Sequence, residues 1–290
     1  TRLIRAGGLH LPFDALVGAT GGLPRKLPDG RNVYTLNDIR AKGGKRIIED
    51  LPCETDKKLF VTIVGGGATG IQILFELEQA LKSLKVPAIL RLVDSHENSL
   101  SGLPTSLASY AGRAMTAKGI SLLSRTRYSG QHGEEIRLED LSTKERYTLA
   151  SHLTFLCPGV LPTPCAIETS ETGQIVSGNT TFEALFSAGD VCRFRGSGLN
   201  ALSAQAAIQK GMTVARNIIR LLQKRTLLPY DYTEQGYFVS LGPDDAVGWI
   251  LSRSIPVKGK AAILLKEAAE IRYELLLHGV KTFLPPLFRG

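Results

Sequence analysis

The sequence predicts an α/β protein in which one α/β unit is inserted into another. Three observations support this fold class: an apolar run that meets closely spaced glycines near residue 65, a helical pattern directly after them, and further strand and helix patterns beyond residue 160. The expected segments are 1–57 (the first part of the outer unit and a linker), 58–160 (the inserted unit), 161–235 (the later part of the outer unit) and 236–290 (strands and an amphipathic helix).

The N-terminal segment is expected to hold one strand and two linkers. Leu9–Ala19 is apolar enough to predict a buried strand that ends in Ala19-Thr20-Gly21-Gly22. Residues 23–31 are rich in proline, glycine and charge, and they predict a linker, as does the polar stretch 42–58. Because the chain begins at Thr1 without a methionine, we expect a truncated piece of a longer protein.

Residues 65–70 carry the spacing G-x-G-x-x-G between a predicted strand, Phe60–Val64, and a predicted helix. In this context Gly65 permits the tight turn, Gly67 lets the backbone approach a pyrophosphate, and Gly70 lets the helix lie close to the strand. The free N–H groups and the dipole at the start of the helix favour the negative charge of a phosphate. The residues predicted to hold a dinucleotide at this turn are Gly65, Gly66, Gly67 and Gly70.

Asp94 follows a second predicted strand, Ala88–Val93, and comes 24 residues after Gly70. A carboxylate at this position accepts hydrogen bonds from the adenosine ribose and repels a 2′-phosphate. Ser95 and His96 follow, and neither Arg nor Lys lies beside the acid, so the sequence favours NAD(H) over NADP(H). The alternative is a glycine-rich turn in another α/β protein, with Asp94 as a solvated strand end.

The remaining elements follow from periodicity and turn residues. Helices are predicted at Ile71–Lys85, Ser106–Lys118, Ala201–Gln223 and Lys260–His278. Strands are predicted at Gly119–Arg125, at Leu153–Cys157, at Leu185–Ala188, within 236–249, and as a meander over 128–149 with turns at Ser129-Gly130 and His132-Gly133.

Composition narrows the class of protein. The apolar fraction of 43% and the charged fraction of 21% are typical of a soluble globular protein. No apolar run approaches the ~20 residues of a membrane span, and the four cysteines form no C-x-x-C pair that would indicate a zinc site. The basic segments lack the aromatic interleaving of a nucleic-acid reader. We therefore expect a cytoplasmic protein with no metal and no nucleic-acid partner.

The C-terminal segment carries much of the positive charge. Residues 251–290 contain seven Lys or Arg against three Glu, a net charge of +4 out of the formal +8. The predicted helix 260–278 has an apolar stripe, for which two interpretations stand: it faces a membrane surface, which would place the protein on the cytoplasmic face, or it packs on the protein. The stripe consists of Leu264, Ala268, Ile271 and Leu275, and the flanking cations are Lys258, Lys260, Lys266 and Arg272.

Five patches of the sequence share their pattern with one family: Phe13–Gly21, residues 64–72, Phe186–Asp190, Ala204–Gln209 and Tyr237–Gly248. Together they resemble the two-dinucleotide-binding flavoproteins of the pyridine nucleotide–disulfide oxidoreductase superfamily. Within that superfamily, the A-Q-x-A-x-Q of Ala204–Gln209 is similar to a quinone-site signature of the type II NADH dehydrogenases (NADH:quinone oxidoreductases). The resemblance implies two Rossmann-like domains (the FAD/NAD(P)-binding fold), with the NAD domain inserted into the FAD domain and the first FAD-binding strand and turn missing.

The resemblance also implies roles for residues. Hydride would pass from NADH to FAD, and electrons would pass on to a quinone or another small acceptor. Gln205 would lie near the flavin ring, and with Gln209 it would border the quinone pocket, since residues four apart share a helix face and an amide can hydrogen-bond a quinone carbonyl. The alternative is a plain polar stripe. The residues implied to line the FAD are Ala19, Thr20, Gly21, Gly189, Asp190 and Gln205.

Two departures from the family pattern matter. The chain has no G-x-G-x-x-G before residue 65, so we expect it to hold FAD weakly or not at all unless preceding residues supply that turn. The type II enzymes usually have Glu where this chain has Gln72, which can form hydrogen bonds but cannot take a proton. Any proton-transfer role at this catalytic position is therefore in doubt.

Two other functions stay open from the sequence. A sulfide:quinone reductase would need redox cysteines, for which Cys157 and Cys192 are the candidates. A non-catalytic NADH-binding domain would agree with Gln72. A disulfide reductase is disfavoured, since only about 55 residues follow Gln235 and a normal domain needs roughly 100. A homodimer is also left open.

Overall fold

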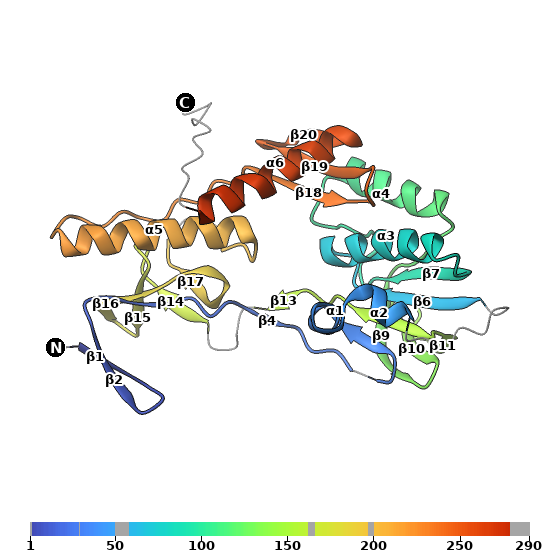
Figure 1. Cartoon of the computed structure of the whole chain (residues 1–290), viewed down its shortest axis with the longest axis horizontal. Helices are drawn as coiled ribbons and strands as arrows, with labels where there is room; N and C mark the ends of the chain where they lie inside the picture. The colour runs from blue at the N-terminus through green and yellow to red at the C-terminus, as the bar shows by residue number, and fades with distance from the viewer. Residues whose placement is uncertain (1, 29, 50–57, 162–165, 197–199, 279–290) are drawn as a thin grey trace. The chain divides into compact units, whose positions relative to one another are not determined.

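The computed structural model describes residues 2–28, 30–49, 58–161, 166–196 and 200–278. The contacts divide the chain into two compact units, drawn with all their elements in Figure 1. The outer unit comprises the residues up to Arg25 together with Gly159–Glu234, and the inserted unit comprises Lys26–Pro158 together with the residues from Gln235 onward. An insertion is thus present, but residues 26–49 and the C-terminal strands and helix group with the inserted unit rather than with the outer one.

The inserted unit is built on a five-stranded sheet in the order β5-β12-β6-β7-β8, in which every neighbouring pair is parallel. Parallel strands are buried on both faces, which explains why β6 and β7 read as nearly continuous apolar runs. The strands are β5 (Val33–Thr35), β12 (Leu153–Leu156), β6 (Leu59–Val64), β7 (Ala88–Val93) and β8 (Ser121–Leu123).

Two layers cover this sheet. Helices α3 (Ala68–Ser83) and α4 (Thr105–Ala117) share a core with one face, through residues such as Phe75 and Phe155. The other face packs against the meander of β9 (Thr126–His132), β10 (Glu135–Asp140) and β11 (Arg146–Ala150), where Val64 and Val93 join Ile136. These helices and strands agree with the sequence prediction to within a few residues.

Two predicted details in the inserted unit are wrong. Ser129-Gly130 is not a turn but lies inside β9, where the register with β10 shifts and Gly130 has φ +140. One extra residue in one strand forms such a bulge without ending the pairing. The described part of the polar stretch 42–58 contains a helix, α2 (Gly44–Glu49), because Ile47 and Ile48 are buried in the main core.

Helix α1 (Leu36–Lys42), which precedes α2, begins at a capping box. The Thr35 hydroxyl accepts from the Asp38 backbone N–H, and the Asp38 carboxylate accepts from the Thr35 backbone N–H at 2.7 Å. The Thr35 hydroxyl also donates to the Asp38 carboxylate at 2.7 Å, and this bond, together with the one from the Thr35 backbone N–H, lowers the pKa of Asp38. The short helix connects β5 to α2 and needs no buried residue of its own.

The outer unit has a five-stranded sheet in the order β17-β14-β15-β16-β3. The pairs β16–β3 and β14–β17 are parallel, and the hairpin of β15 and β16 is antiparallel. Helix α5 (Ala204–Leu222) packs Val214 into a core with Phe186 and Phe194. The strands are β3 (Leu16–Gly18), β14 (Ile167–Thr169), β15 (Gln174–Ser177), β16 (Thr180–Ser187) and β17 (Cys192–Phe194), with a 3₁₀ turn η1 (Gly189–Val191) between the last two.

The predicted buried strand over Leu9–Ala19 is wrong. It divides at Asp14 into β2 (Leu9–Phe13) and β3; among the described strands, β2 pairs only with β1 (Arg2–Ala6). Leu9 is 64% exposed because a two-stranded hairpin has no second layer to cover it. In the predicted linker 23–31, β4 (Leu23–Pro24) pairs with β13 (Val160–Leu161).

The C-terminal elements belong to the inserted unit. The antiparallel strands β18 (Gly236–Ser240), β19 (Ala246–Ile250) and β20 (Ser252–Lys258) place Val239 and Trp249 in the core with α3 and α4. Helix α6 (Lys260–Leu277) follows and buries Ala262. Its predicted apolar stripe is exposed, so among the described residues the stripe does not pack on the protein. No helix in the described part of the chain is long and apolar enough to span a membrane.

Candidate functional site: two nucleotide-binding turns

Two glycines at the turn after β6 and the start of α3 lie too close to neighbouring backbone to carry a side chain. Gly65 has φ +108, and its N–H donates to the Val93 carbonyl at 2.8 Å. A Cβ at Gly65 would overlap the Cys157 carbonyl oxygen, and a Cβ at Gly70 would overlap the Gly65 carbonyl oxygen. The strand, the turn and α3 therefore lie as close together as the glycine spacing predicts.

Gly67 differs from its neighbours because the space around it is open. It is the N-cap of α3, no side chain caps the helix there, and a Cβ would meet nothing within 4 Å. The first N–H groups of a helix have no partner inside the helix. This turn therefore combines open space with unpaired donors and a positive dipole end, which suits a phosphate.

Asp94 lies against the same turn. It is 6% exposed, and a Cβ at Gly66 would overlap its Oδ2. Its Oδ1 accepts from the His96 backbone N–H at 3.0 Å and lies 3.0 Å from His96 Nδ1, while the Gly66 carbonyl accepts from the Leu100 N–H at 2.7 Å. Asp94 is therefore not a solvated strand end, and the predicted glycine turn and acid lie together. Gln72 lies in α3 close behind Gly70 and is half-buried.

In the outer unit, two of the segments implied to line the FAD begin at the same end of two neighbouring strands, although they lie far apart in the sequence. Ala19, Thr20 and Gly21 follow β3, and Gly189 follows β16 after Ala188. The strands run parallel with Ser187 opposite Gly18. The Gly18 carbonyl accepts from the Ser187 hydroxyl at 2.7 Å and from the Ala188 N–H at 3.0 Å. Ligands of α/β sheets bind at such carboxyl ends.

Asp190 occupies the 3₁₀ turn at this end of the sheet. Gly189 begins the turn with φ +77. The Asp190 side chain is half-buried, and within the described residues its Oδ1 is buried without a hydrogen-bond partner. A buried acceptor without a partner is rare and is satisfied when a ligand hydroxyl donates to it. Asp190 thus fits the ribityl hydroxyls of a flavin, the group that the resemblance implies here.

Helix α5 begins at Ser203, whose hydroxyl accepts from the Ala206 N–H at 3.2 Å. Gln205 and Gln209 are both half-buried in its first turns. Gln209 forms two bonds to the backbone of Thr233: its Nε2 donates to the carbonyl at 2.8 Å, and its Oε1 accepts from the N–H at 3.2 Å. Its amide oxygen and one amide N–H are therefore engaged within the protein, a role that spacing alone did not indicate.

Neither described cysteine has the character of a redox thiol. Burial raises the pKa of Cys157 to about 12. Burial also raises the pKa of Cys192, although the charge of Lys210 opposes the shift. Because the thiolate is the reactive form, both groups are poor nucleophiles at neutral pH. The remaining two, Cys53 and Cys165, lie outside the described residues.

Lys210 was missed by the sequence reasoning. It is 1% exposed, and it occupies the buried face of α5 together with Ala206, Val214 and Asn217. The sequence does carry a signal for this burial. These four residues follow one another at steps of four, four and three, which places the lysine on the same helix face as Ala206 and Val214.

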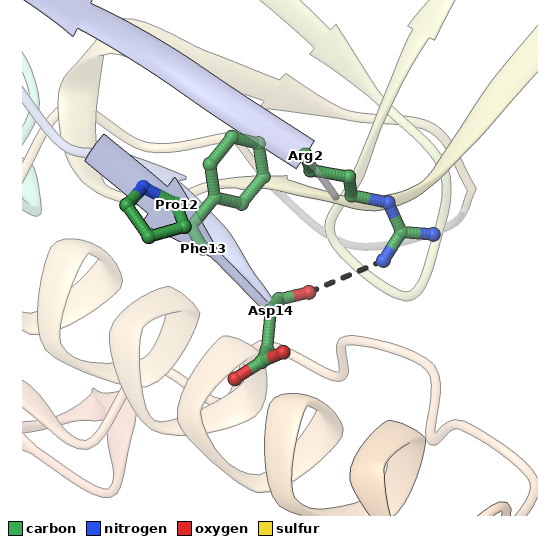
Figure 2. A pocket seen from close by; sticks show the side chains of 4 residues that line it. All are labelled: Arg2, Pro12, Phe13 and Asp14. Carbon is green, nitrogen blue, oxygen red and sulfur yellow. Dashed lines mark hydrogen bonds between the residues drawn. The ribbon is translucent and has the colours of Figure 1, made fainter. Parts of the chain in front are cut away.

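A separate hollow lies at the N-terminal hairpin. It is lined by Arg2, Pro12, Phe13 and Asp14, and Figure 2 shows the Arg2 guanidinium donating to the Asp14 carbonyl. Arg2 also pairs with Glu183 at 3.1 Å. None of the predicted site residues lines this hollow.

Two α/β units, with nucleotide-type turns at the carboxyl ends of their parallel strands, define a protein of the two-domain Rossmann type. The family model of the pyridine nucleotide-disulphide oxidoreductases matches residues 2–211, and the chain belongs to that family.

Three relatives illustrate the comparison. A type II NADH:quinone oxidoreductase of Staphylococcus epidermidis is 27% identical over 92% of this chain and 73% of its own length. The demethylphylloquinone reductase NdbB of Synechocystis is 27% identical over 90% of this chain and 66% of its own length. The solved structure of NDH2 from Plasmodium falciparum in complex with NADH has a TM-score of 0.76 over 91% of this chain and 75% of its own, with 13% identity, and supports the fold.

Proposed function

We propose that this chain is the nucleotide-binding part of a flavin-dependent NADH:quinone oxidoreductase. The observation that carries the proposal is the Asp190 carboxylate, whose buried Oδ1 has no described partner and lies at the strand ends where Ala19–Gly21 also emerge. A protein that only binds NADH does not need this second site. Relatives named as type II NADH:quinone oxidoreductases support the choice of reaction.

The inserted unit binds NADH. The open N-terminus of α3 at Gly67 receives the pyrophosphate through backbone N–H groups. Asp94, held by the His96 N–H, presents its carboxylate to the adenosine ribose and repels a 2′-phosphate. The unit therefore selects NADH over NADPH.

The outer unit holds the ribityl side of FAD, through Gly189, Asp190 and the Ala19–Gly21 segment. When bound, FAD accepts a hydride from NADH and passes electrons to a quinone. The N-terminal turn of α5 supplies N–H groups and a positive dipole end, which favour negative charge nearby. These 290 residues contain one G-x-G-x-x-G, the NADH turn, so the ADP half of FAD needs donors from elsewhere.

Gln205 is the residue of A-Q-x-A-x-Q that we assign to the quinone, as a side-chain amide that can donate to a carbonyl oxygen. Gln209 instead holds Thr233 in place beside the helix. Gln72 cannot accept a proton as a carboxylate would, so the protons that the quinone takes up when electrons reduce it reach it through another group or through water.

The protein also docks peripherally on a membrane surface through α6. Leu264 is 66% exposed and Ile271 is 58% exposed, on the side of the helix away from buried Ala262. Charge contributes less than expected, because the Glu270 carboxylate offsets the charge of Lys266. The apolar stripe is therefore the main support for membrane docking, and a second copy of the chain on this stripe is the competing arrangement.

The test uses protein expressed from its complete reading frame. We expect a yellow protein that oxidises NADH faster than NADPH and reduces a short-chain quinone. A colourless protein that binds NADH without oxidising it would contradict the proposal and favour a non-catalytic NADH-binding domain. Quinone reduction with sulfide and not with NADH would indicate the sulfide:quinone reductase, which the high pKa of Cys157 disfavours.

A further inference from the structure

A single buried cation lies beneath the Gly189–Asp190 turn in the described part of the outer unit. The Lys210 side chain is 1% exposed and follows Ala206 on the buried face of α5. Withdrawing an ammonium group from water is unfavourable unless strong partners replace the water. The position of Lys210 therefore points to a specific set of contacts.

Those contacts join both ends of the turn. The Lys210 ammonium donates to the Cys192 carbonyl at 2.8 Å and to the Gly189 carbonyl at 3.3 Å, and its Nζ lies 5.7 Å from the centre of the Phe194 ring. Because the two carbonyls flank the 3₁₀ turn Gly189–Val191, one charged group holds the start and the end of the turn together.

Asp190 lies between these two anchor points. Burial lowers the pKa of Lys210 below its ordinary value, although the nearby Cys192 sulfur and then the Asp190 charge oppose the shift. No hydrogen bond between Lys210 and Asp190 occurs among the described residues, and Asp190 Oδ1 keeps no partner. Lys210 thus fixes the backbone around Asp190 without engaging its carboxylate, and among the described residues Oδ1 is left without a donor.

We propose that Lys210 is a positioning residue of the flavin site, which holds the Gly189–Cys192 turn so that Asp190 can accept from a ribityl hydroxyl of FAD. The inference rests on the proposed flavin function. It assigns no contact between Lys210 and the flavin, because the ammonium is directed at backbone carbonyls.

Three variants of the full-length protein test the proposal. Lys210→Met removes the charge and keeps a similar length, and Lys210→Arg restores the charge and the donors. The control is Asn217→Leu, in the same helix. Asn217 is fully buried, donates to the carbonyls of Thr172 and Leu228 and accepts from the Leu228 N–H, each at 2.8 Å. Its loss removes a comparable set of buried bonds without touching the Gly189 turn.

FAD is removed and its rebinding is titrated at a temperature where circular dichroism shows every variant folded. Lys210→Met should raise the Kd for FAD about tenfold or more, because only a fraction of molecules then keeps the competent turn. Hydrogen exchange should accelerate in residues 186–194 of this variant. Lys210→Arg should recover part of the affinity, and Asn217→Leu should lower the Tm while leaving the Kd for FAD near wild type.

Other outcomes overturn the inference in distinguishable ways. If Lys210→Met binds FAD as tightly as wild type, or if Asn217→Leu weakens FAD binding equally, Lys210 has no special role, while the proposed function stands. If the wild-type protein itself binds no FAD, both the proposed function and this inference fail. Hydrogen exchange of the turn then still reports whether Lys210 holds it.

Discussion

Gly66 packs so closely against Asp94 that any side chain at position 66 would collide with the Asp94 carboxylate. The two residues follow the adjacent parallel strands β6 and β7, at the end of the sheet where both strands finish. The contact explains why the position between the two fingerprint glycines is itself glycine. It also holds the acid against the turn on which a pyrophosphate would lie.

Gly66→Ala and Gly67→Ala should therefore have different effects. We expect the first to destabilise the inserted unit by about 1–3 kcal/mol, since Asp94 must move. The second should change stability by less than about 1 kcal/mol, as its surroundings are open, and should raise the KM for NADH at least tenfold, since its methyl group fills the pyrophosphate space. Thermal unfolding and steady-state kinetics check both.

Gly112→Ala in α4 is the matched control for these two variants, since its Cβ would also meet nothing within 4 Å. It should leave the KM for NADH unchanged and stabilise the helix by up to about 1 kcal/mol. An unaltered KM for NADH in Gly67→Ala would contradict the assignment of the turn.

Asp94→Asn should narrow the preference for NADH over NADPH. The amide keeps the shape but loses the charge that repels a 2′-phosphate, so kcat/KM for NADH should fall about tenfold and that for NADPH should rise. The comparison is Asp140→Asn in the meander, where the carboxylate accepts from the N–H groups of Ser142 and Thr143. That variant should unfold more easily and keep the NADH preference. Equal preferences in wild type and Asp94→Asn would reject the role.

Gln205→Leu and Gln209→Leu should separate binding from structure. We expect Gln205→Leu to raise the KM for the quinone severalfold. Gln209→Leu removes two hydrogen bonds to the exposed Thr233 backbone, whose N–H and carbonyl water can then satisfy, so it should lower stability by only about 1 kcal/mol. Identical effects of the two variants on the Tm and on the KM for the quinone would refute this division of roles.

Cys157 should resist alkylation in the native protein. Its pKa of about 12 lies above the ordinary value of 9.0, so the thiol stays protonated at neutral pH and gains thiolate only as pH rises towards 12. Peptide mapping after iodoacetamide treatment should show slow labelling at pH 7 and a rate still increasing at pH 10. Rapid labelling at pH 7 would reopen a thiol-based reaction, as would loss of quinone reduction in Cys157→Ala with NADH binding intact.

Substitutions on the exposed stripe of α6 should release the protein from membranes. Leu264→Ser with Ile271→Ser should weaken binding to vesicles that contain anionic lipid by at least tenfold, since two exposed apolar side chains are lost. Leu222→Ser changes a similarly exposed leucine of α5 and serves as the control. Charge reversal at Lys258 and Lys260 tests the electrostatic part. Unchanged vesicle binding together with loss of a dimer in sedimentation would identify the stripe as a contact between copies.

Sequence patterns were sufficient for the elements whose signal is local. The strand Leu59–Val64, the turn at Gly65 and the helix from Ala68 were all predictable, because strand burial, glycine spacing and helical periodicity lie within 25 residues. The hairpin at Leu9 could not be predicted. Its apolar residues have the same pattern as a buried strand, and exposure depends on whether another layer covers them.

The sequence by itself determined the glycine turn at Gly65, the acid that follows it, and the strands and helices directly around them, since these depend on short-range backbone geometry. Tertiary structure alone decided which distant segments meet: Gly18 with Ser187, Gln209 with Thr233, and Lys210 with the carbonyls of Gly189 and Cys192. Such contacts are set by strand pairing and by the need of buried polar groups for partners, and neither is written in local spacing.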